Sequence, residues 1–116
     1  MRVLSQIEAS VLWLLEANKW VSQNLRSAAQ TRGIDPIRLI FAPKLAHDEY
    51  LARHSCADLF IDTFNVNAHT TASDALWAGL PLVTKAGKGF TARVAASLLT
   101  AIGLPELIVE IEAAYE

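Results

Sequence analysis

The sequence predicts an α/β protein built on a parallel sheet, in a Rossmann-like three-layer arrangement with helices on both faces of the sheet. Almost wholly apolar runs of about five residues, typical of strands buried on both faces, recur along the chain. Segments with apolar residues at helical spacing separate these runs. The 116 residues include 53% hydrophobic residues, enough for one compact core, and no low-complexity linker divides them. We therefore expect residues 1–116 to form a single domain.

The first half of the chain alternates between helical and strand patterns. Lys19–Thr31 is expected to be a helix because its apolar residues recur at helical spacing, and Gly33 stands where a helix end commonly needs a left-handed residue. The expected elements are, in order, the last turns of a helix over 1–8, a strand over Val11–Leu15, a helix over Lys19–Thr31, a strand over Ile37–Ala42 opened by Pro36, and a helix over Ala46–His54.

The second half continues the alternation. The run LFIDT predicts a strand, and the stretch from Thr91 is strongly apolar at helical spacing. The expected elements are, in order, a strand over Leu59–Thr63, a helix from about Ser73 to Ala78, a strand over Leu80–Thr84, a helix over Thr91–Ile102 and a last helix from Pro105.

Ligands of parallel sheets bind outside the carboxyl ends of the strands, which directs attention to the loop Phe64–Thr71. Free backbone N–H groups at the start of the following helix favour an anion, and His69, Thr70 and Thr71 add side-chain donors suited to a diphosphate. Asp74, one turn further, is suited to accept hydrogen bonds from sugar hydroxyls. The alternative is a capping box formed by Thr71 and Asp74, which stabilises a helix start by ~1 kcal/mol without a ligand. From spacing alone, the cap is the more frequent explanation.

Other polar groups give weaker indications. The three histidines and Cys56 lack zinc-type spacing, so we expect no metal. Asp58 and Asp62 flank a strand and lie too far apart to share an ion, which favours strand capping and loop anchoring. The stretch Lys85–Gly89 lacks the residue order of a phosphate-binding P-loop, so a flexible loop between strand and helix is expected.

Charge and composition exclude several classes of partner. The net charge is −2 and no run of lysine or arginine occurs, so neither a nucleic acid nor an anionic membrane is an expected partner. The single Cys56 fits a reducing compartment, and the chain shows neither a signal peptide nor an apolar membrane-spanning stretch. We expect a cytoplasmic protein.

Several segments together resemble the carboxyl-terminal catalytic lobe of the O-linked N-acetylglucosamine transferase family, which includes SPINDLY-type and bacterial tetratricopeptide-linked members. The likeness covers nearly the whole chain, and the HTT-x-x-D element within it is specific. The segments that carry it are SVLWLL (Ser10–Leu15), RLIFAP (Arg38–Pro43), ADLFIDT (Ala57–Thr63), NAHTTASDALWAGLPLVT (Asn67–Thr84), FTARVAASLL (Phe90–Leu99) and GLPELI (Gly103–Ile108).

The resemblance implies a GT-B glycosyltransferase, in which the carboxyl-terminal lobe holds the donor UDP-N-acetylglucosamine. His69, Thr70 and Thr71 match the positions around the diphosphate, and Asp74 matches the position at the ribose. The positions that match the surroundings of uracil are Leu45, His47, Tyr50 and Arg53. His47 stands where a lysine is familiar, and Tyr50 stands where a histidine stacks on the base. An aromatic ring at Tyr50 retains the capacity to stack.

The implied reaction transfers N-acetylglucosamine to a serine or threonine hydroxyl of a protein, with inversion and with no metal or other cofactor. No catalytic residue is assigned on this chain, because the matched residues stabilise the departing UDP. Acceptor proteins are expected to bind through regions outside the chain. A non-catalytic nucleotide-binding module, an oligomerisation module and a degenerate remnant remain the alternatives.

In the family, the lobe begins with a strand and a loop that bring a glutamine and a lysine to the phosphates. This chain begins in the helix that follows, so we expect the first strand to be lacking and the chain alone to have little or no transferase activity. In a doubly wound sheet, that loss deprives Val11–Leu15 and Leu59–Thr63 of their shared neighbour. The exposed edges predict a homodimer or strand exchange.

Overall fold

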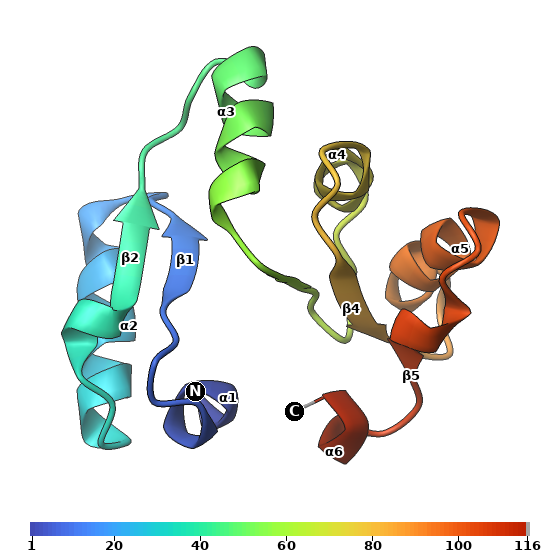
Figure 1. Ribbon diagram of the computed structural model, residues 1–116. Coiled ribbons are helices and arrows are strands. Elements are labelled where there is room, and N and C mark those ends of the chain that lie inside the picture. Colours follow the sequence, from blue (N-terminus) through green and yellow to red (C-terminus); the bar gives the residue numbers. More distant parts are fainter. Residues whose placement is uncertain (116) are drawn as a thin grey trace. The chain divides into compact units, whose positions relative to one another are not determined.

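The computed structural model describes residues 1–115, which fold into two compact units that divide between Leu45 and Ala46 (Figure 1). Each unit combines parallel β-strands with helices, so the expected α/β class with parallel pairing is confirmed. None of the helices in the described part of the chain has the length and apolarity needed to cross a membrane.

The first unit places a long helix against a two-stranded parallel sheet. Its elements are α1 (Arg2–Gln6), β1 (Leu12–Leu15), α2 (Lys19–Thr31), the 3₁₀ turn η1 (Pro36–Arg38) and β2 (Leu39–Ala42). Leu12 of β1 lies opposite Leu39 of β2. The buried core of the unit consists of Leu4, Ala29, Ile34 and Leu39.

Both ends of α2 follow from the local sequence. The side chain of Asn18 accepts a hydrogen bond from the N–H of Val21 at 2.9 Å, which caps the start. At the other end, Gly33 has a φ of 74° and the N–H of Ile34 bonds to the carbonyl of Ala29 at 3.0 Å. The left-handed glycine expected after this helix is therefore confirmed.

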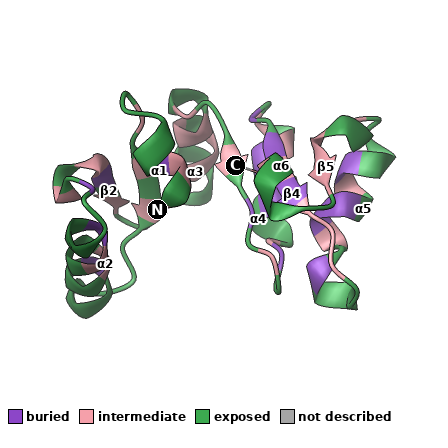
Figure 2. Ribbon diagram, turned by 90° about the horizontal axis from the view of Figure 1, so that it is seen from below, coloured by how far each residue is buried: buried purple, intermediate pink, exposed green. Residues whose placement is uncertain are grey.

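The second unit contains a three-stranded parallel sheet in the order β3-β4-β5. Its elements are α3 (His47–Arg53), η2 (His54–Cys56), β3 (Phe60–Ile61), α4 (Thr70–Trp77), β4 (Leu82–Lys85), η3 (Phe90–Ala92), α5 (Val94–Ala101), η4 (Pro105–Leu107), β5 (Ile108–Val109) and α6 (Glu112–Tyr115). The core forms where α4 and α5 pack on β4, through Ala72, Leu82, Ala95 and Leu99 (Figure 2). The small alanines allow both helices to approach the central strand closely.

Two expectations about this unit are wrong. The helix expected from about Ser73 begins at Thr70, so Thr70 and Thr71 are its first two residues. The last helix expected from Pro105 is a single 3₁₀ turn followed by β5, and only Glu112–Tyr115 is helical. Ile108 and Val109 are β-branched residues that favour a strand, and they form one by pairing with β4.

All described strands except β4 lie at a sheet edge, and β1 and β3 bear on the expected exposed edges. Strand β1 pairs only with β2, and β3 pairs only with β4, among the residues that the structure describes. Val11–Leu15 and Leu59–Thr63 were expected to lack a shared neighbour, and the strands found there each have one unpaired edge. That another chain covers these edges remains a prediction.

Candidate functional site

The start of α4 lies just beyond the carboxyl end of β3, at the edge of the sheet where ligands are expected. His69 is the residue before the helix, and Thr70 and Thr71 are its first two residues. No side chain caps this helix. The capping box of Thr71 and Asp74 does not form, because Thr71 already lies within the helix instead of preceding it.

The polar side chains at this helix start are available to a ligand. Within residues 1–115, neither the ring of His69 nor the hydroxyls of Thr70 and Thr71 have a hydrogen-bond partner, and all three residues are exposed. The Asp74 carboxylate also has no hydrogen-bond partner in this part of the chain and is half-buried. Unsatisfied N–H groups and the helix dipole add to these donors. The arrangement suits an anion at the helix start and a hydroxyl-bearing group one turn further.

Tyr50 on α3 lies close enough to Asp74 for the two to interact electrostatically. Burial raises the pKa of Tyr50, the Asp74 carboxylate raises the same pKa further, and the Arg53 guanidinium opposes both effects. The Tyr50 ring meets His54 edge to face, with ring centroids 4.7 Å apart, and lies 6.1 Å from the ring of His47. The second unit therefore brings Tyr50, expected at uracil, near Asp74, expected at the ribose.

The remaining uracil candidates have different environments. His47 begins α3 and is exposed, whereas Arg53 ends α3 and is half-buried. Leu45 is half-buried at the end of the first unit, and its expected place at the base remains a prediction.

Asp62 holds the loop that leads from β3 into α4. It is 4% exposed, and its carboxylate accepts hydrogen bonds from the N–H of Thr63 at 2.9 Å, the N–H of Ala68 at 2.7 Å and the hydroxyl of Thr84 at 2.8 Å. The expected loop-anchoring role of Asp62 is confirmed. The bond to Thr84 also ties the loop to the central strand.

Asn67 joins the same loop to α5, a role that the sequence did not indicate. This buried amide donates to the carbonyl of Thr63 at 2.8 Å and accepts from the N–H of Ala95 at 3.3 Å. The N–H of Asn67 bonds to the carbonyl of Thr91 at 2.7 Å. Two of these partners lie more than twenty residues away in the chain, so no local pattern reveals them.

Tyr115 closes this network from α6. Its hydroxyl donates a hydrogen bond to the carbonyl of Asp62, and its ring meets Phe64 edge to face at 4.8 Å. Burial, assisted by the Asp62 carboxylate, raises the pKa of Tyr115 from 10.0 to about 12.

This shift predicts a loss of stability at alkaline pH. The unfolded chain releases the Tyr115 proton near pH 10, whereas the folded chain holds it to about pH 12, so the contribution is complete below pH 10 and is lost as the pH rises toward 12. We expect the free energy of unfolding of the wild type to fall in this window relative to Tyr115→Phe, while at neutral pH the variant is less stable by about 1 kcal/mol. Urea denaturation of both proteins at several pH values measures the difference, and parallel pH curves would contradict the assignment.

The described residues contain no candidate metal site. No three His, Cys, Asp or Glu side chains within residues 1–115 are grouped as a metal site requires. Cys56 is a free, exposed thiol.

A parallel α/β unit whose uncapped helix start lies at the carboxyl edge of the sheet, with a carboxylate and an aromatic ring close by, has the features of a nucleotide-binding domain. Comparison with known proteins identifies the particular family. The chain belongs to glycosyl transferase family 41, which matches residues 1–116.

The relatives agree on this family. The chain is 37% identical over 114 residues to a UDP-N-acetylglucosamine–peptide N-acetylglucosaminyltransferase of Caenorhabditis elegans, covering 98% of the chain and 10% of that protein. It is 36% identical over 102 residues to the probable enzyme of this kind named SEC in Arabidopsis thaliana, covering 88% of the chain and 10% of that protein. The chain thus spans about a tenth of the length of these curated relatives.

A solved structure supports the fold. A mutant of the O-GlcNAc transferase of Thermobaculum terrenum superposes with a TM-score of 0.93 at 29% identity, covering 98% of this chain and 22% of that one. The expected fold, part of a lobe of a GT-B glycosyltransferase, is confirmed by this similarity.

Proposed function

We propose that the chain is the UDP-sugar donor-binding part of an inverting glycosyltransferase that moves N-acetylglucosamine from UDP-N-acetylglucosamine to serine or threonine hydroxyls of proteins. The observation that carries the proposal is the uncapped start of α4, where His69, Thr70 and Thr71 offer unpaired side-chain groups. Membership of glycosyl transferase family 41 and the names of the relatives support the donor and the reaction.

In this proposal the helix start binds the donor diphosphate. When the bond between sugar and phosphate breaks, negative charge develops on the departing UDP, and the N–H groups of α4 with the hydroxyls of Thr70 and Thr71 stabilise that charge. His69 donates from its ring to the same oxygens. No metal is needed, because backbone and side-chain donors supply the stabilisation.

The nucleoside would extend from the helix start toward α3. Asp74 accepts hydrogen bonds from the ribose hydroxyls, and the half-buried ring of Tyr50 stacks on the uracil. Arg53 and His47 border the base on the same helix. The order of the groups, from diphosphate to ribose to base, follows the order from His69 through Asp74 to Tyr50.

Titration calorimetry of the chain with UDP tests the donor site. We expect saturable binding with a dissociation constant below about 1 mM, which corresponds to about −4 kcal/mol or better. Absence of heat at millimolar UDP would contradict the proposal and would favour a remnant or an assembly module. In the same preparation we expect little or no transfer from UDP-N-acetylglucosamine to a serine-bearing peptide, and robust turnover would contradict that expectation.

The unpaired edges of β1 and β3 favour oligomerisation as a second role. We propose a homodimer or strand exchange through these edges. Sedimentation at several concentrations distinguishes this arrangement from a monomer, and a mass that stays at the monomer value throughout would count against it.

A further inference from the structure

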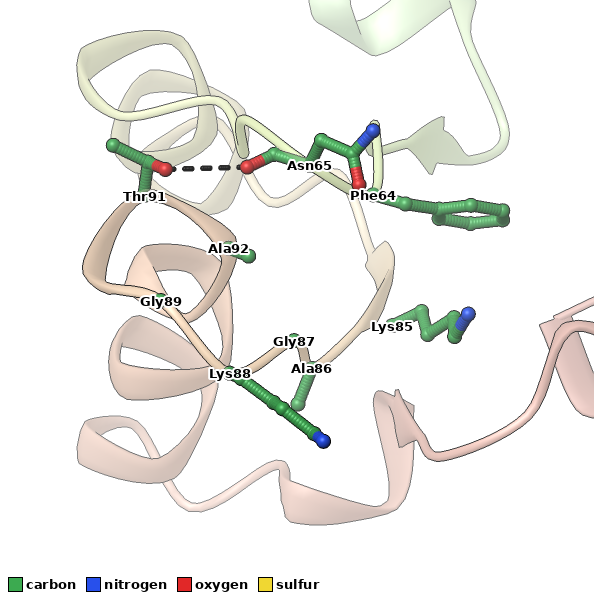
Figure 3. A pocket seen from close by; sticks show the side chains of 9 residues that line it. All are labelled: Phe64, Asn65, Lys85, Ala86, Gly87, Lys88, Gly89, Thr91 and Ala92. Atoms are coloured by element: carbon green, nitrogen blue, oxygen red, sulfur yellow. Dashed lines mark hydrogen bonds between the residues drawn. The ribbon is translucent and has the colours of Figure 1, made fainter.

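The loop between β4 and η3 separates two cavities of the second unit. One, of about 260 Å³, lies between this loop and the segment of Phe64 and Asn65 (Figure 3). The other, of about 680 Å³, lies between the loop and the β5 region. We call the second cavity the basic cleft; the residues that define it are Lys85, Lys88, Arg93, Pro105, Ile108 and Glu110.

The basic cleft has the opposite charge to the chain as a whole. Three cations and the carboxylate of Glu110 line it, and with Glu112 paired to one of the cations the cleft is still net positive, whereas the whole chain carries −2. Lys85 also forms an ion pair with Glu112, in which the Glu112 carboxylate lies 3.3 Å from Nζ of Lys85. Lys88 is exposed and has no charged or hydrogen-bonding partner within the described residues. Figure 3 shows its side chain extending away from Asn65 and Thr91.

The backbone of the loop is held in a defined shape. The N–H of Gly87 bonds to the carbonyl of Ala92 at 2.8 Å, and Nη1 of Arg93 donates to the carbonyl of Gly87 at 2.8 Å. A Cβ at Gly87 would lie 2.5 Å from the Cβ of Ala92, so this approach requires glycine. The N–H groups of Lys88 and Gly89 have no acceptor in the part of the chain described here. Of these two residues, Lys88 lines the basic cleft, whereas Gly89 lines only the first cavity.

The first residue after the loop, Phe90 of η3, contacts the proposed donor site. Phe90 is 82% exposed, and its ring lies edge to face with that of His69, with centroids 6.4 Å apart. The diphosphate candidates lie at the start of α4, after β3, whereas the basic cleft lies after β4 and beside β5. The basic cleft shares no lining residue with the proposed diphosphate site, so an anion in the cleft would be distinct from the donor diphosphate.

We propose that the basic cleft binds an acidic side chain, a carboxylate or a phosphate, of the acceptor polypeptide. The inference rests on the proposed function, because it takes a protein as the acceptor, and it adds a contact on this chain to the regions outside it through which acceptors are expected to bind. Lys88 and Arg93 meet the anion, and Pro105 and Ile108 provide apolar surface for the neighbouring part of the peptide. The cleft would thereby favour acceptor segments that carry acidic residues near the modified hydroxyl.

The test follows backbone amide signals of the ¹⁵N-labelled chain by NMR. The probes are a serine peptide containing glutamates, the same peptide with glutamines, a phosphoserine version, inorganic phosphate, and UDP in a separate titration. We expect the glutamate and phosphoserine peptides to shift the signals of Lys88 and Gly89, and the glutamine peptide to leave them in place. Equal effects of the glutamate and glutamine peptides would overturn the proposal. Inorganic phosphate binding as tightly as the peptides would overturn the assignment to a polypeptide.

Charge reversal supplies the matched variants. Lys88→Glu is expected to weaken binding of the glutamate peptide about fivefold or more, as loss and reversal of a surface charge would do, while Lys19→Glu, an exposed lysine of the first unit, leaves it unchanged. Unchanged binding by Lys88→Glu would overturn the proposal. If UDP shifts the amide signals of Thr70 and Thr71 but no peptide shifts any signal, the proposal for the basic cleft is overturned and the donor site stands. Peptide shifts at Lys88 without any UDP effect would support the cleft as an anion site and contradict the donor site.

Discussion

Replacing Asp62 with alanine is expected to lower the free energy of unfolding by about 3 kcal/mol, since it leaves three donors, among them the buried hydroxyl of Thr84, without their acceptor. The carboxylate is 4% exposed and accepts from the N–H groups of Thr63 and Ala68 and from the hydroxyl of Thr84. Water has little access to replace it. Urea denaturation followed by circular dichroism measures the loss, and hydrogen exchange of the loop before α4 locates it in the second unit.

Two further variants make this result specific. Asp62→Asn keeps a carbonyl oxygen for the N–H groups and is expected to cost clearly less than alanine. Asp58→Ala removes an exposed carboxylate just before β3 and is expected to change stability by no more than about 0.5 kcal/mol. Equal losses for Asp58→Ala and Asp62→Ala would contradict the anchoring role.

UDP binding is expected to fall by about tenfold or more in each of His69→Ala and Asp74→Asn. His69→Ala removes a donor to the charged diphosphate, and Asp74→Asn removes the carboxylate charge and one of its two acceptor oxygens; hydrogen bonds that involve a charged group are worth about 1.5–3 kcal/mol in proteins. Titration calorimetry measures both affinities. Asp58→Asn serves as the control for Asp74→Asn, because it makes the same chemical change at an exposed position before β3.

The Asp74→Asn variant also reports on the geometry of the site. The Asp74 carboxylate raises the pKa of Tyr50, so its replacement should lower that pKa, which ultraviolet titration detects. A lowered Tyr50 pKa with unchanged UDP affinity would mean that the site is formed but does not bind the ribose. UDP affinity that survives both His69→Ala and Asp74→Asn would exclude the start of α4 as the donor site.

Local patterns predicted much of the fold. Apolar spacing located α2 over its full length, and Gly33 marked its end, because both signals lie within a few residues of the structure that they specify. Strand β5 was not predicted because two residues are too few to show the alternation typical of a strand. The strand is recognised only from its pairing with β4. The start of α4 was placed too late because Thr71 and Asp74 have the spacing of a cap without its geometry.

The sequence pointed to the exposed residues of the candidate site but not to the buried residues that hold its loop in place. His69, Thr70 and Thr71 stood out because polar residues open a helix directly after an apolar strand. Asn67 and Tyr115 did not, because their partners are brought together only by the folded chain: Ala95 for Asn67, and the carbonyl of Asp62 for Tyr115. The exposed residues of the site are therefore readable locally, whereas the contacts that hold them require the tertiary structure.

The uncapped start of α4 makes the first turn of this helix an incomplete piece of secondary structure. Any anion that binds there accepts hydrogen bonds from the N–H groups of the first turn, so the ligand takes the place of a capping side chain. Anion binding and the stability of α4 are then thermodynamically coupled, so that each favours the other. A mutation that placed a capping side chain at the start of α4 would therefore raise the free energy of unfolding. It would also weaken anion binding, because the cap and the anion compete for the same N–H groups.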